Sequence, residues 1–166
     1  MLVFIFASLS SHTIFASAPN WVASTIDGKT ISLDDELDKG NRVVMIFWAT
    51  WCGHCKALLP LLDELQTNLR NTTKPESANS PGVTFVAFNI WEDSDPITYV
   101  KQRALSLPIS VKAESIARKY GVKGTAAVFV IGGENEILYR RKNGERPKKV
   151  MAAIKQSLMP PQTTSN

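Results

Sequence analysis

Two cysteines three positions apart are the residues of this chain best suited to chemistry. They occur in the segment Cys52-Gly53-His54-Cys55 and are the only cysteines among the 166 residues. At that spacing on a first helical turn the two backbones lie about 5–6 Å apart, within the range that a disulfide bond needs. The pair can therefore open and close without moving the backbone. The spacing predicts redox chemistry.

The surroundings of the pair favour ionisation of the first cysteine. An apolar run at residues 43–48 ends just before it, and a helical pattern begins at it. At a helix start, free backbone N–H groups and the positive end of the helix dipole stabilise an anion. We therefore expect Cys52 to ionise more easily than a free thiol and to be the more exposed thiolate, with Cys55 beneath it.

Two other uses of the cysteine pair are less well supported by the sequence. A structural zinc site needs four ligands, whereas the chain offers this one pair and only two histidines, His12 and His54. A permanent structural disulfide would enclose only two residues, so it would remove little entropy from the unfolded chain and stabilise little.

Length and composition indicate one globular domain. With 44% apolar and 20% charged residues, the chain has enough apolar side chains for a full core and does not resemble a disordered protein. The net charge of +4 is modest. Its densest basic cluster, residues 140–149, lacks interleaved aromatic side chains, so we interpret it as a solvated strand end and helix start rather than a nucleic-acid or membrane patch.

The N-terminus has the features of an export signal. Residues 2–9 are nearly all apolar, and Ala16-Ser17-Ala18 supplies the small residues of a cleavage site. We expect a signal peptide at residues 1–18, a domain at residues 19–159 and a disordered tail at residues 160–166. Export, with the bacterial periplasm favoured, would place the cysteines in an oxidising compartment. An uncleaved N-terminus would instead tether the protein, whose mature chain has no run long enough to span a membrane.

Short apolar strands alternate with helical patterns along the chain, which is typical of an α/β fold with helices on both faces of a sheet. The helix that follows the cysteines contains Pro60, which predicts a kink. We expect a hairpin at residues 26–31, strands at residues 43–48, 83–90, 127–131 and 136–140, a short extended piece at residues 107–109, and further helices at residues 97–104, 114–120 and 147–159.

These segments resemble a known family. Residues 48–56, followed by Pro60, look like the active-site strand and helix of the thioredoxin superfamily, and residues 120–125 look like the approach to its substrate loop. The resemblance spans roughly residues 21–158. The hairpin, the run at residues 47–52 and an inserted helix are similar to the exported TlpA/ResA-like branch, whereas the Gly53-His54 pair is that of protein disulfide isomerases.

The resemblance implies a thioredoxin-like fold with a central mixed sheet, an N-terminal hairpin and an inserted helix. It implies a thiol:disulfide oxidoreductase that acts on protein substrates and a redox partner protein, with Cys52 as nucleophile and Cys55 as resolving cysteine. We expect a monomer that needs no organic cofactor and no metal. Trp51, Gly53, His54 and Lys56 are candidate modulators of the couple; His54 can place a hydrogen bond or positive charge on the Cys52 sulfur.

The substrate loop departs from the family pattern. The chain has Ala126 after Thr125, where the family has a cis-proline facing the disulfide. Because a cis bond before a residue other than proline costs about 2.5–4 kcal/mol, we expect a trans Thr125-Ala126 bond and an altered substrate groove formed by Trp51, Thr125 and Ala126. Without the proline ring, the two thiolates could also bind a thiophilic metal such as Cu(I), so copper binding or delivery is the alternative function.

Two further departures concern proton transfer. Ile46 and Leu58 occupy positions where related proteins carry a buried aspartate and a glutamate, respectively. No acid is then in register to deprotonate Cys55, and proton transfer would fall to water, Lys56 or the more distant Glu92 or Asp93. These two acids more commonly cap a turn from strand to helix.

Overall fold

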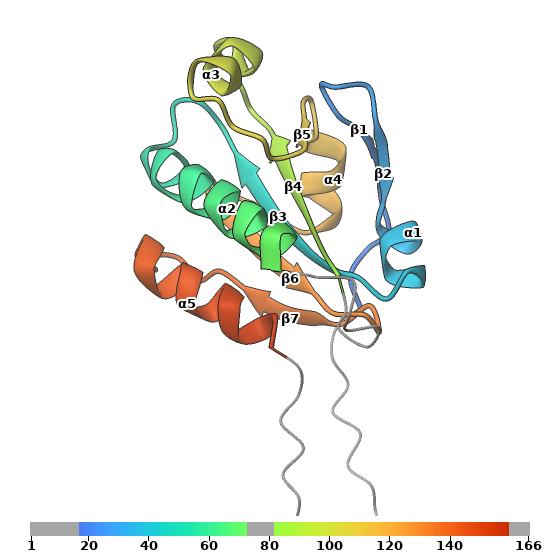
Figure 1. The fold of residues 1–166 in the computed structure, drawn as a ribbon. Coiled ribbons are helices and arrows are strands. Elements are labelled where there is room, and N and C mark those ends of the chain that lie inside the picture. Colours follow the sequence, from blue (N-terminus) through green and yellow to red (C-terminus); the bar gives the residue numbers. More distant parts are fainter. Residues whose placement is uncertain (1–16, 73–81, 160–166) are drawn as a thin grey trace, which may run out of the picture.

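The five-stranded sheet of this protein is mixed, as expected. The computed structural model describes residues 17–72 and 82–159 (Figure 1). The strands are β3 (Arg42–Trp48), β4 (Val83–Asn89), β5 (Ile109–Ser110), β6 (Ala127–Ile131) and β7 (Ile137–Arg140), in the spatial order β5-β4-β3-β6-β7. β3, β4 and β5 are parallel, whereas β6 and β7 run antiparallel to their neighbours.

The central strand β3 is buried on both faces of the sheet. Its six residues after Arg42 are all apolar and at most 2% exposed, as the uninterrupted apolar run predicts. Because successive side chains of a strand point to opposite faces, alternate residues enter two different cores. Val44, Ile46 and Trp48 belong to one core, and Val43, Met45 and Phe47 belong to the other.

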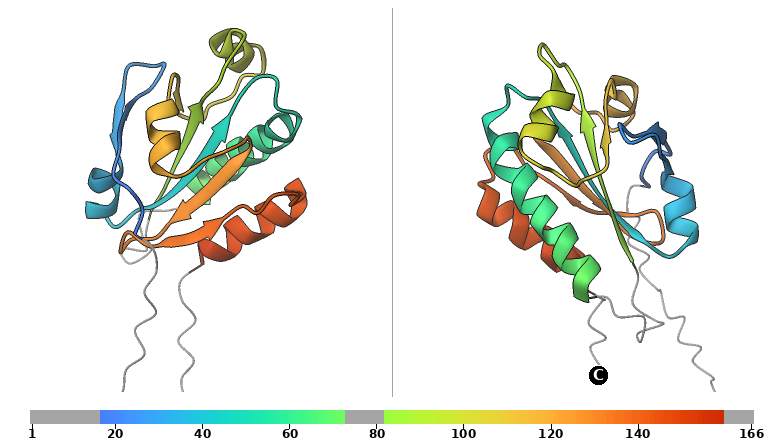
Figure 2. Two further views of the ribbon diagram at one scale, coloured as in Figure 1. Left: turned by 180° about the vertical axis from the view of Figure 1, so that it is seen from behind. Right: turned by 45° about the horizontal axis from the view of Figure 1, so that its top comes forward.

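Helices cover both faces, as expected (Figure 2). The face of Val44 and Trp48 is covered by α2 (Gly53–Thr72), α3 (Pro96–Gln102) and α5 (Pro147–Ser157). The opposite face is covered by α1 (Leu33–Asp38), α4 (Glu114–Lys119) and the hairpin of β1 (Val22–Ser24) and β2 (Thr30–Ser32). The thioredoxin-like arrangement expected from the sequence is therefore present.

Local signals account for some of the helix boundaries. The carboxylate of Asp95 accepts hydrogen bonds from the N–H groups of Ile97 and Thr98, which makes it the N-cap of α3. Gly121, with φ of 59°, follows the end of α4. The sequence prediction missed α1, which begins after Ser32. The α2 helix continues through Pro60, and the kink stays a prediction.

The described part of the chain begins inside the fold. Ser17 forms an antiparallel bridge with Glu136, and the N–H of Ala18 donates to the carbonyl of Asn135 at 2.9 Å. Residues 17 and 18 are thus attached to the turn between β6 and β7. The apolar stretch expected to be a signal and the expected tail at residues 160–166 lie outside the described residues. None of the helices described is long and apolar enough to cross a bilayer.

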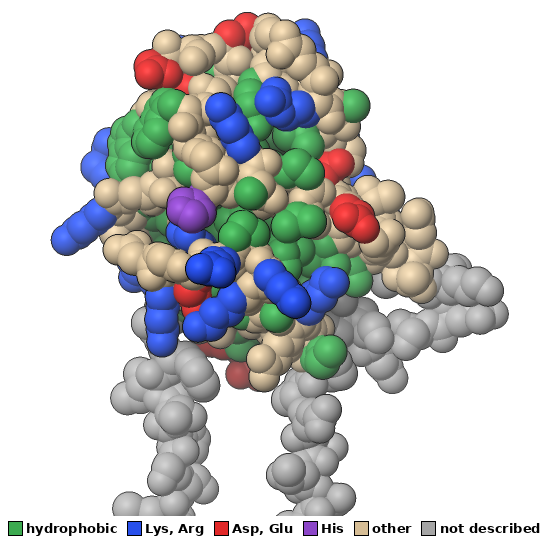
Figure 3. Space-filling model, turned by 90° about the vertical axis from the view of Figure 1, so that its left-hand side faces the viewer, with side chains coloured by type: hydrophobic (Ala, Val, Ile, Leu, Met, Phe, Trp, Pro, Cys, Tyr) green, Lys and Arg blue, Asp and Glu red, His purple; other side chains and the backbone are tan. Residues whose placement is uncertain are grey.

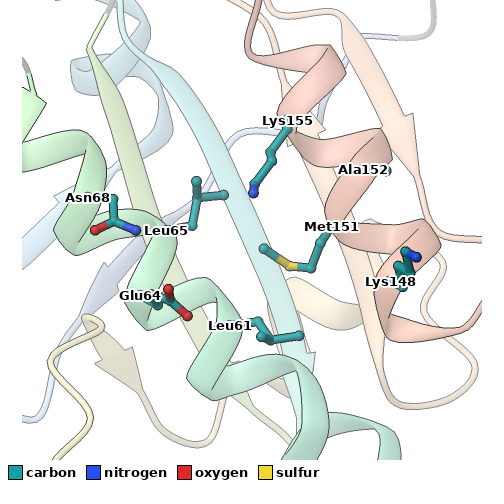
Figure 4. A pocket seen from close by; sticks show the side chains of 8 residues that line it. All are labelled: Leu61, Glu64, Leu65, Asn68, Lys148, Met151, Ala152 and Lys155. Atoms are coloured by element: carbon teal, nitrogen blue, oxygen red, sulfur yellow. The ribbon is translucent and has the colours of Figure 1, made fainter.

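The α2 and α5 helices lie side by side and leave a surface groove between them (Figure 4). Leu61, Leu65 and Met151 form its apolar part, and Lys148 and Lys155 flank it. Leu61 is 37% exposed there, whereas the next residue, Leu62, is 1% exposed and packs in the core.

These neighbouring leucines give a matched test of the packing. Leu62→Ala is expected to lower the free energy of unfolding by about 2–5 kcal/mol, because it leaves a cavity between α2 and the sheet. Leu61→Ala, on the exposed side of the same helix, should cost less than about 1 kcal/mol. Urea unfolding of both oxidised variants measures the difference, and equal losses would contradict this placement of α2.

Candidate active site

The cysteine pair lies where the central strand ends and α2 begins. Cys52 and Cys55 form a disulfide, with Cα atoms 5.2 Å apart, within the separation expected from the spacing. Cys52 is 5% exposed and Cys55 is fully buried. The expected order of exposure is therefore present, although Cys52 shows only a small surface in the oxidised protein.

The first turn of α2 is directed at the Cys52 sulfur. The backbone N–H of Cys55 donates to Cys52 Sγ at 3.2 Å, and the N–H of Lys56 donates to the Cys52 carbonyl at 3.1 Å. Cys52 thus takes the N-cap position of the helix. An N–H donor and the helix dipole both favour negative charge on this sulfur, which agrees with the ionisation expected from the sequence.

Gly53, His54 and Lys56 are exposed on the first turn of α2. Figure 3 faces this end of the molecule and shows the histidine at the surface, with Lys and Arg side chains around it. These three candidate modulators therefore lie on the exposed side of the turn that carries the two cysteines, and their effect on the couple stays a prediction.

Trp51, the residue before Cys52, is connected to a second tryptophan, Trp91. Trp51 is 50% exposed, and its indole N–H donates to the carbonyl of Trp91 at 2.9 Å. Trp91 is 42% exposed, has a φ of 51° and donates its own backbone N–H to Glu114. The sequence analysis singled out Trp51 but missed Trp91, whose placement depends on a contact 40 residues away in the chain.

Glu92 ties the loop before Cys52 to the end of β4. Its carboxylate accepts hydrogen bonds from the backbone N–H of Thr50 at 2.8 Å, from the Thr50 hydroxyl at 2.5 Å and from the side-chain amide of Asn89 at 2.7 Å. It also accepts from the backbone N–H groups of Asp93 and Ser94. The interpretation of Glu92 as a capping residue is therefore confirmed, and the carboxylate reaches further than its own turn.

The same contacts set the protonation of Glu92. Burial raises the pKa of this carboxyl, but the hydrogen bonds from Thr50, Asn89 and the backbone of Asp93 outweigh it. The net effect holds the pKa of Glu92 below its ordinary value of 4.5. A carboxylate so occupied is a structural anion at neutral pH.

The expectation of a trans bond before Ala126 is wrong. The Thr125-Ala126 peptide bond is cis although Ala126 is not a proline. Local preference disfavours this bond, but the tertiary structure determines the loop here. Ala126 is 3% exposed, its carbonyl accepts a hydrogen bond from Arg141 Nη1 at 2.7 Å, and the next residue starts β6. The sequence analysis missed Arg141 as a support of this loop.

Strand pairing brings the Thr125-Ala126 loop to the disulfide. β3 and β6 are antiparallel and Phe47 pairs with Ala127, so the segment before Ala127 lies beside the segment after Phe47. Ala126 belongs to the same buried cluster as Cys52 and Cys55. The predicted groove residues and the predicted redox couple are thus brought to one end of the sheet.

The two residues that replace the acids expected for proton transfer also lie near the cysteines. Ile46 and Leu58 are at most 2% exposed and belong to the cluster that contains both cysteines. Apolar side chains therefore stand where related proteins were expected to carry acids. Within residues 17–72 and 82–159, no group of three or more His, Cys, Asp or Glu side chains is arranged to hold a metal ion.

The fold and the paired cysteines at the start of α2 define a thioredoxin-like class of protein. The family model described as thioredoxin matches residues 25–95. The chain therefore contains a thioredoxin-fold domain, and the resemblance to the thioredoxin superfamily is confirmed.

The relatives agree with the ResA-like branch. The chain is 28% identical over 157 residues to the thiol-disulfide oxidoreductase ResA of Bacillus cereus (strain ATCC 10987 / NRS 248), covering 93% of this chain and 84% of the relative. It is 27% identical over 136 residues to ResA of Bacillus subtilis (strain 168), covering 81% and 70%. A crystal structure of a putative thiol:disulfide interchange protein DsbE from Chlorobium tepidum has a TM-score of 0.69 at 24% identity, covering 90% of this chain and all of that one.

The contacts of Glu92 lead to a stability prediction. Glu92→Gln removes the charge that Thr50 and Asn89 hold, so we expect the free energy of unfolding at neutral pH to fall by about 1–3 kcal/mol. Asp93→Asn, at the exposed neighbouring position, is the control and should change it by less than about 0.5 kcal/mol.

The loss should depend on pH in a defined direction. The folded state lowers the Glu92 pKa, so the stabilisation is present above the ordinary value of 4.5 and is lost as the pH falls through the lower folded value. Denaturant unfolding at pH 7 and at about pH 3 should therefore show the difference between wild type and Glu92→Gln shrinking in acid. A difference that is constant with pH would refute the role of the charge.

Proposed function

We propose that this protein is a thiol:disulfide oxidoreductase that exchanges disulfides with protein substrates through the Cys52–Cys55 couple. The observation that carries the proposal is the disulfide at the start of α2, with the Cys55 N–H donated to the Cys52 sulfur. The relatives named thiol-disulfide oxidoreductases support it. They give no support to the alternative of copper binding or delivery.

The exchange proceeds by two substitutions at sulfur. In the reducing direction, the Cys52 thiolate attacks one sulfur of a substrate disulfide, and the other substrate sulfur leaves as a thiolate. The Cys55 thiolate then attacks Cys52 Sγ, closes the Cys52–Cys55 disulfide and releases the second substrate thiolate. The substrate gains two electrons, which the cysteine pair loses. The oxidising direction runs through the same mixed disulfide in reverse.

The burial of the two cysteines supports these roles. Cys52 has the larger accessible surface, so its sulfur is the one that a substrate meets. Because this sulfur accepts a hydrogen bond from the backbone N–H of Cys55, it is also the better leaving thiolate. Cys55 is fully buried, lies one turn in and is bonded to the Cys52 sulfur, so it is placed to attack that sulfur rather than a substrate.

The surrounding residues adjust this couple. His54 stabilises the Cys52 thiolate by a positive charge or hydrogen bond, which makes the disulfide a better oxidant. Gly53 is a further candidate modulator, and Lys56 can serve in proton transfer. With Ile46 and Leu58 apolar, the proton of Cys55 passes to water or Lys56. Trp51, Thr125 and Ala126 form the groove that receives the substrate chain.

We propose that the protein is exported to the periplasm, acts there as a monomer and is recharged by a redox partner protein. The apolar N-terminal stretch and the small residues at positions 16–18 support export. Mass determination of the protein from separated periplasmic and cytoplasmic fractions tests it: a periplasmic chain that starts near residues 17–19 is expected, and an unprocessed cytoplasmic chain would exclude it.

The equilibrium reduction potential tests the proposed function directly. We expect a reversible two-electron titration in glutathione or dithiothreitol buffers, read by the fluorescence of Trp48 and Trp51. A potential near about −180 mV would indicate oxidation or isomerisation, and one near about −270 mV a reductant; the gap is roughly 4 kcal/mol. Failure to titrate reversibly would refute the proposed oxidoreductase function.

Cysteine variants provide the control for this titration. Neither Cys52→Ser nor Cys55→Ser should titrate as a two-electron couple. Cys55→Ser should accumulate mixed disulfides with added disulfide-bonded protein substrates, because the resolving thiol is gone, whereas Cys52→Ser should accumulate far less. The reverse pattern would exchange the proposed roles.

A further inference from the structure

A groove with basic side chains lies beside the proposed active site. It is lined by two segments, residues 121–127, which lead into β6, and residues 140–143, which begin at the last residue of β7. Its inner end contains Thr125 and Ala126, which strand pairing brings next to the disulfide. Figure 3 shows Lys and Arg side chains gathered at the surface near the histidine.

Four cationic side chains line the groove, namely Lys123, Arg140, Arg141 and Lys142, and none of the lining residues is acidic. Lys123, Arg140 and Lys142 are exposed. Like charges so close together repel one another, so an arrangement of this kind favours an anion in the groove. The sequence analysis interpreted this basic run as a solvated surface, but the fold adds Lys123 from a different segment.

The charges of the groove are not neutralised by the protein. In the described part of the chain, ion pairs join Lys29 to Asp27, Lys39 to Glu36 and Lys149 to Glu145. Glu145 is the acid nearest to the groove in sequence, and its carboxylate is occupied by Lys149, the Tyr139 hydroxyl and the backbone N–H of Lys142. The ammonium groups of Lys123 and Lys142 therefore remain available.

The two arginines have different tasks. Arg141 donates to the carbonyls of Ala126 and Glu145, so it supports the walls of the groove. Arg140 lies over the ring of Phe129 at 5.3 Å and donates to the Gly121 carbonyl at 3.3 Å, which fixes its guanidinium at the rim. The groove thus combines two fixed cations with two lysines that can adjust to an occupant.

We propose that this basic groove, formed by residues 121–127 and 140–143, binds an acidic segment of the protein substrate next to its reacting cysteine. The proposal rests on the proposed oxidoreductase function and names its substrate class: cysteines flanked by Asp or Glu. Opposite charges raise the rate of encounter and orient the segment, so the preference acts on the rate at which the mixed disulfide forms.

The test uses disulfide-linked homodimers of three short peptides, each with one cysteine flanked by acidic, neutral or basic residues. The Cys52 thiolate of the reduced protein attacks one peptide sulfur, one peptide thiolate leaves, and Cys55 then displaces the second. Stopped-flow tryptophan fluorescence follows the oxidation of the protein. Dividing each rate constant by that of dithiothreitol with the same peptide removes the intrinsic reactivity of the peptide disulfide.

We expect the acidic peptide to react about 5–20-fold faster than the neutral one at low salt. The preference should disappear between about 0.01 M and about 1 M salt, where the Debye length falls from about 30 Å to about 3 Å. The double variant Lys123→Gln/Lys142→Gln should lower the ratio of acidic to neutral rates several-fold.

The matched control is Lys101→Gln/Lys155→Gln, which removes the same charge from exposed positions outside the groove and should keep the ratio. Equal corrected rates for the three peptides, a preference for the basic peptide, or an equal effect of both double variants would overturn the acidic substrate class. If the protein reduces none of the peptide disulfides and shows no reversible couple, the proposed function itself fails.

Discussion

The burial of β3 on both faces is the constraint on which the site depends. Because alternate residues of this strand enter two separate cores, it cannot slide or rotate without exposing apolar side chains on one face or the other. Its carboxyl end is therefore a fixed point. The N-terminus of α2 follows it directly, and the antiparallel pairing with β6 brings the Thr125-Ala126 loop to the same edge.

Hydrogen bonds between distant segments convert this fixed edge into a defined site. Glu92 holds Thr50 through both its backbone and its side chain, and Trp51 holds the carbonyl of Trp91. On the other side, Arg141 holds the carbonyl of Ala126. The disulfide thus lies between two loops that are each secured by a side chain from another strand end. Such support keeps the first turn of α2 directed at the Cys52 sulfur while that sulfur changes its bonding.

The apolar interior and the basic rim divide the work of the site. Ile46 and Leu58 belong to the apolar cluster that contains both cysteines, so the proposed mechanism relies on groups at the surface for protonation. The charged groups lie outside, on the first turn of α2 and along the groove formed by residues 121–127 and 140–143. In the proposed assignment, chemistry at sulfur and recognition of a partner depend largely on different residues, which can vary independently within one fold.

The sequence by itself determined the cysteine couple and the main strand and helix elements around it. Three of its features are local patterns, which can be recognised from neighbouring residues: the spacing of Cys52 and Cys55, the apolar run of β3 and the Asp95 cap of α3. Only the tertiary structure decided three others. They are the cis bond before Ala126, the hydrogen bonds from Thr50 to Glu92 and the position of Lys123 in the same groove as the basic residues 140–142. Each of these depends on residues far apart in the chain, and their proximity arises from the pairing of strands and the packing of two cores.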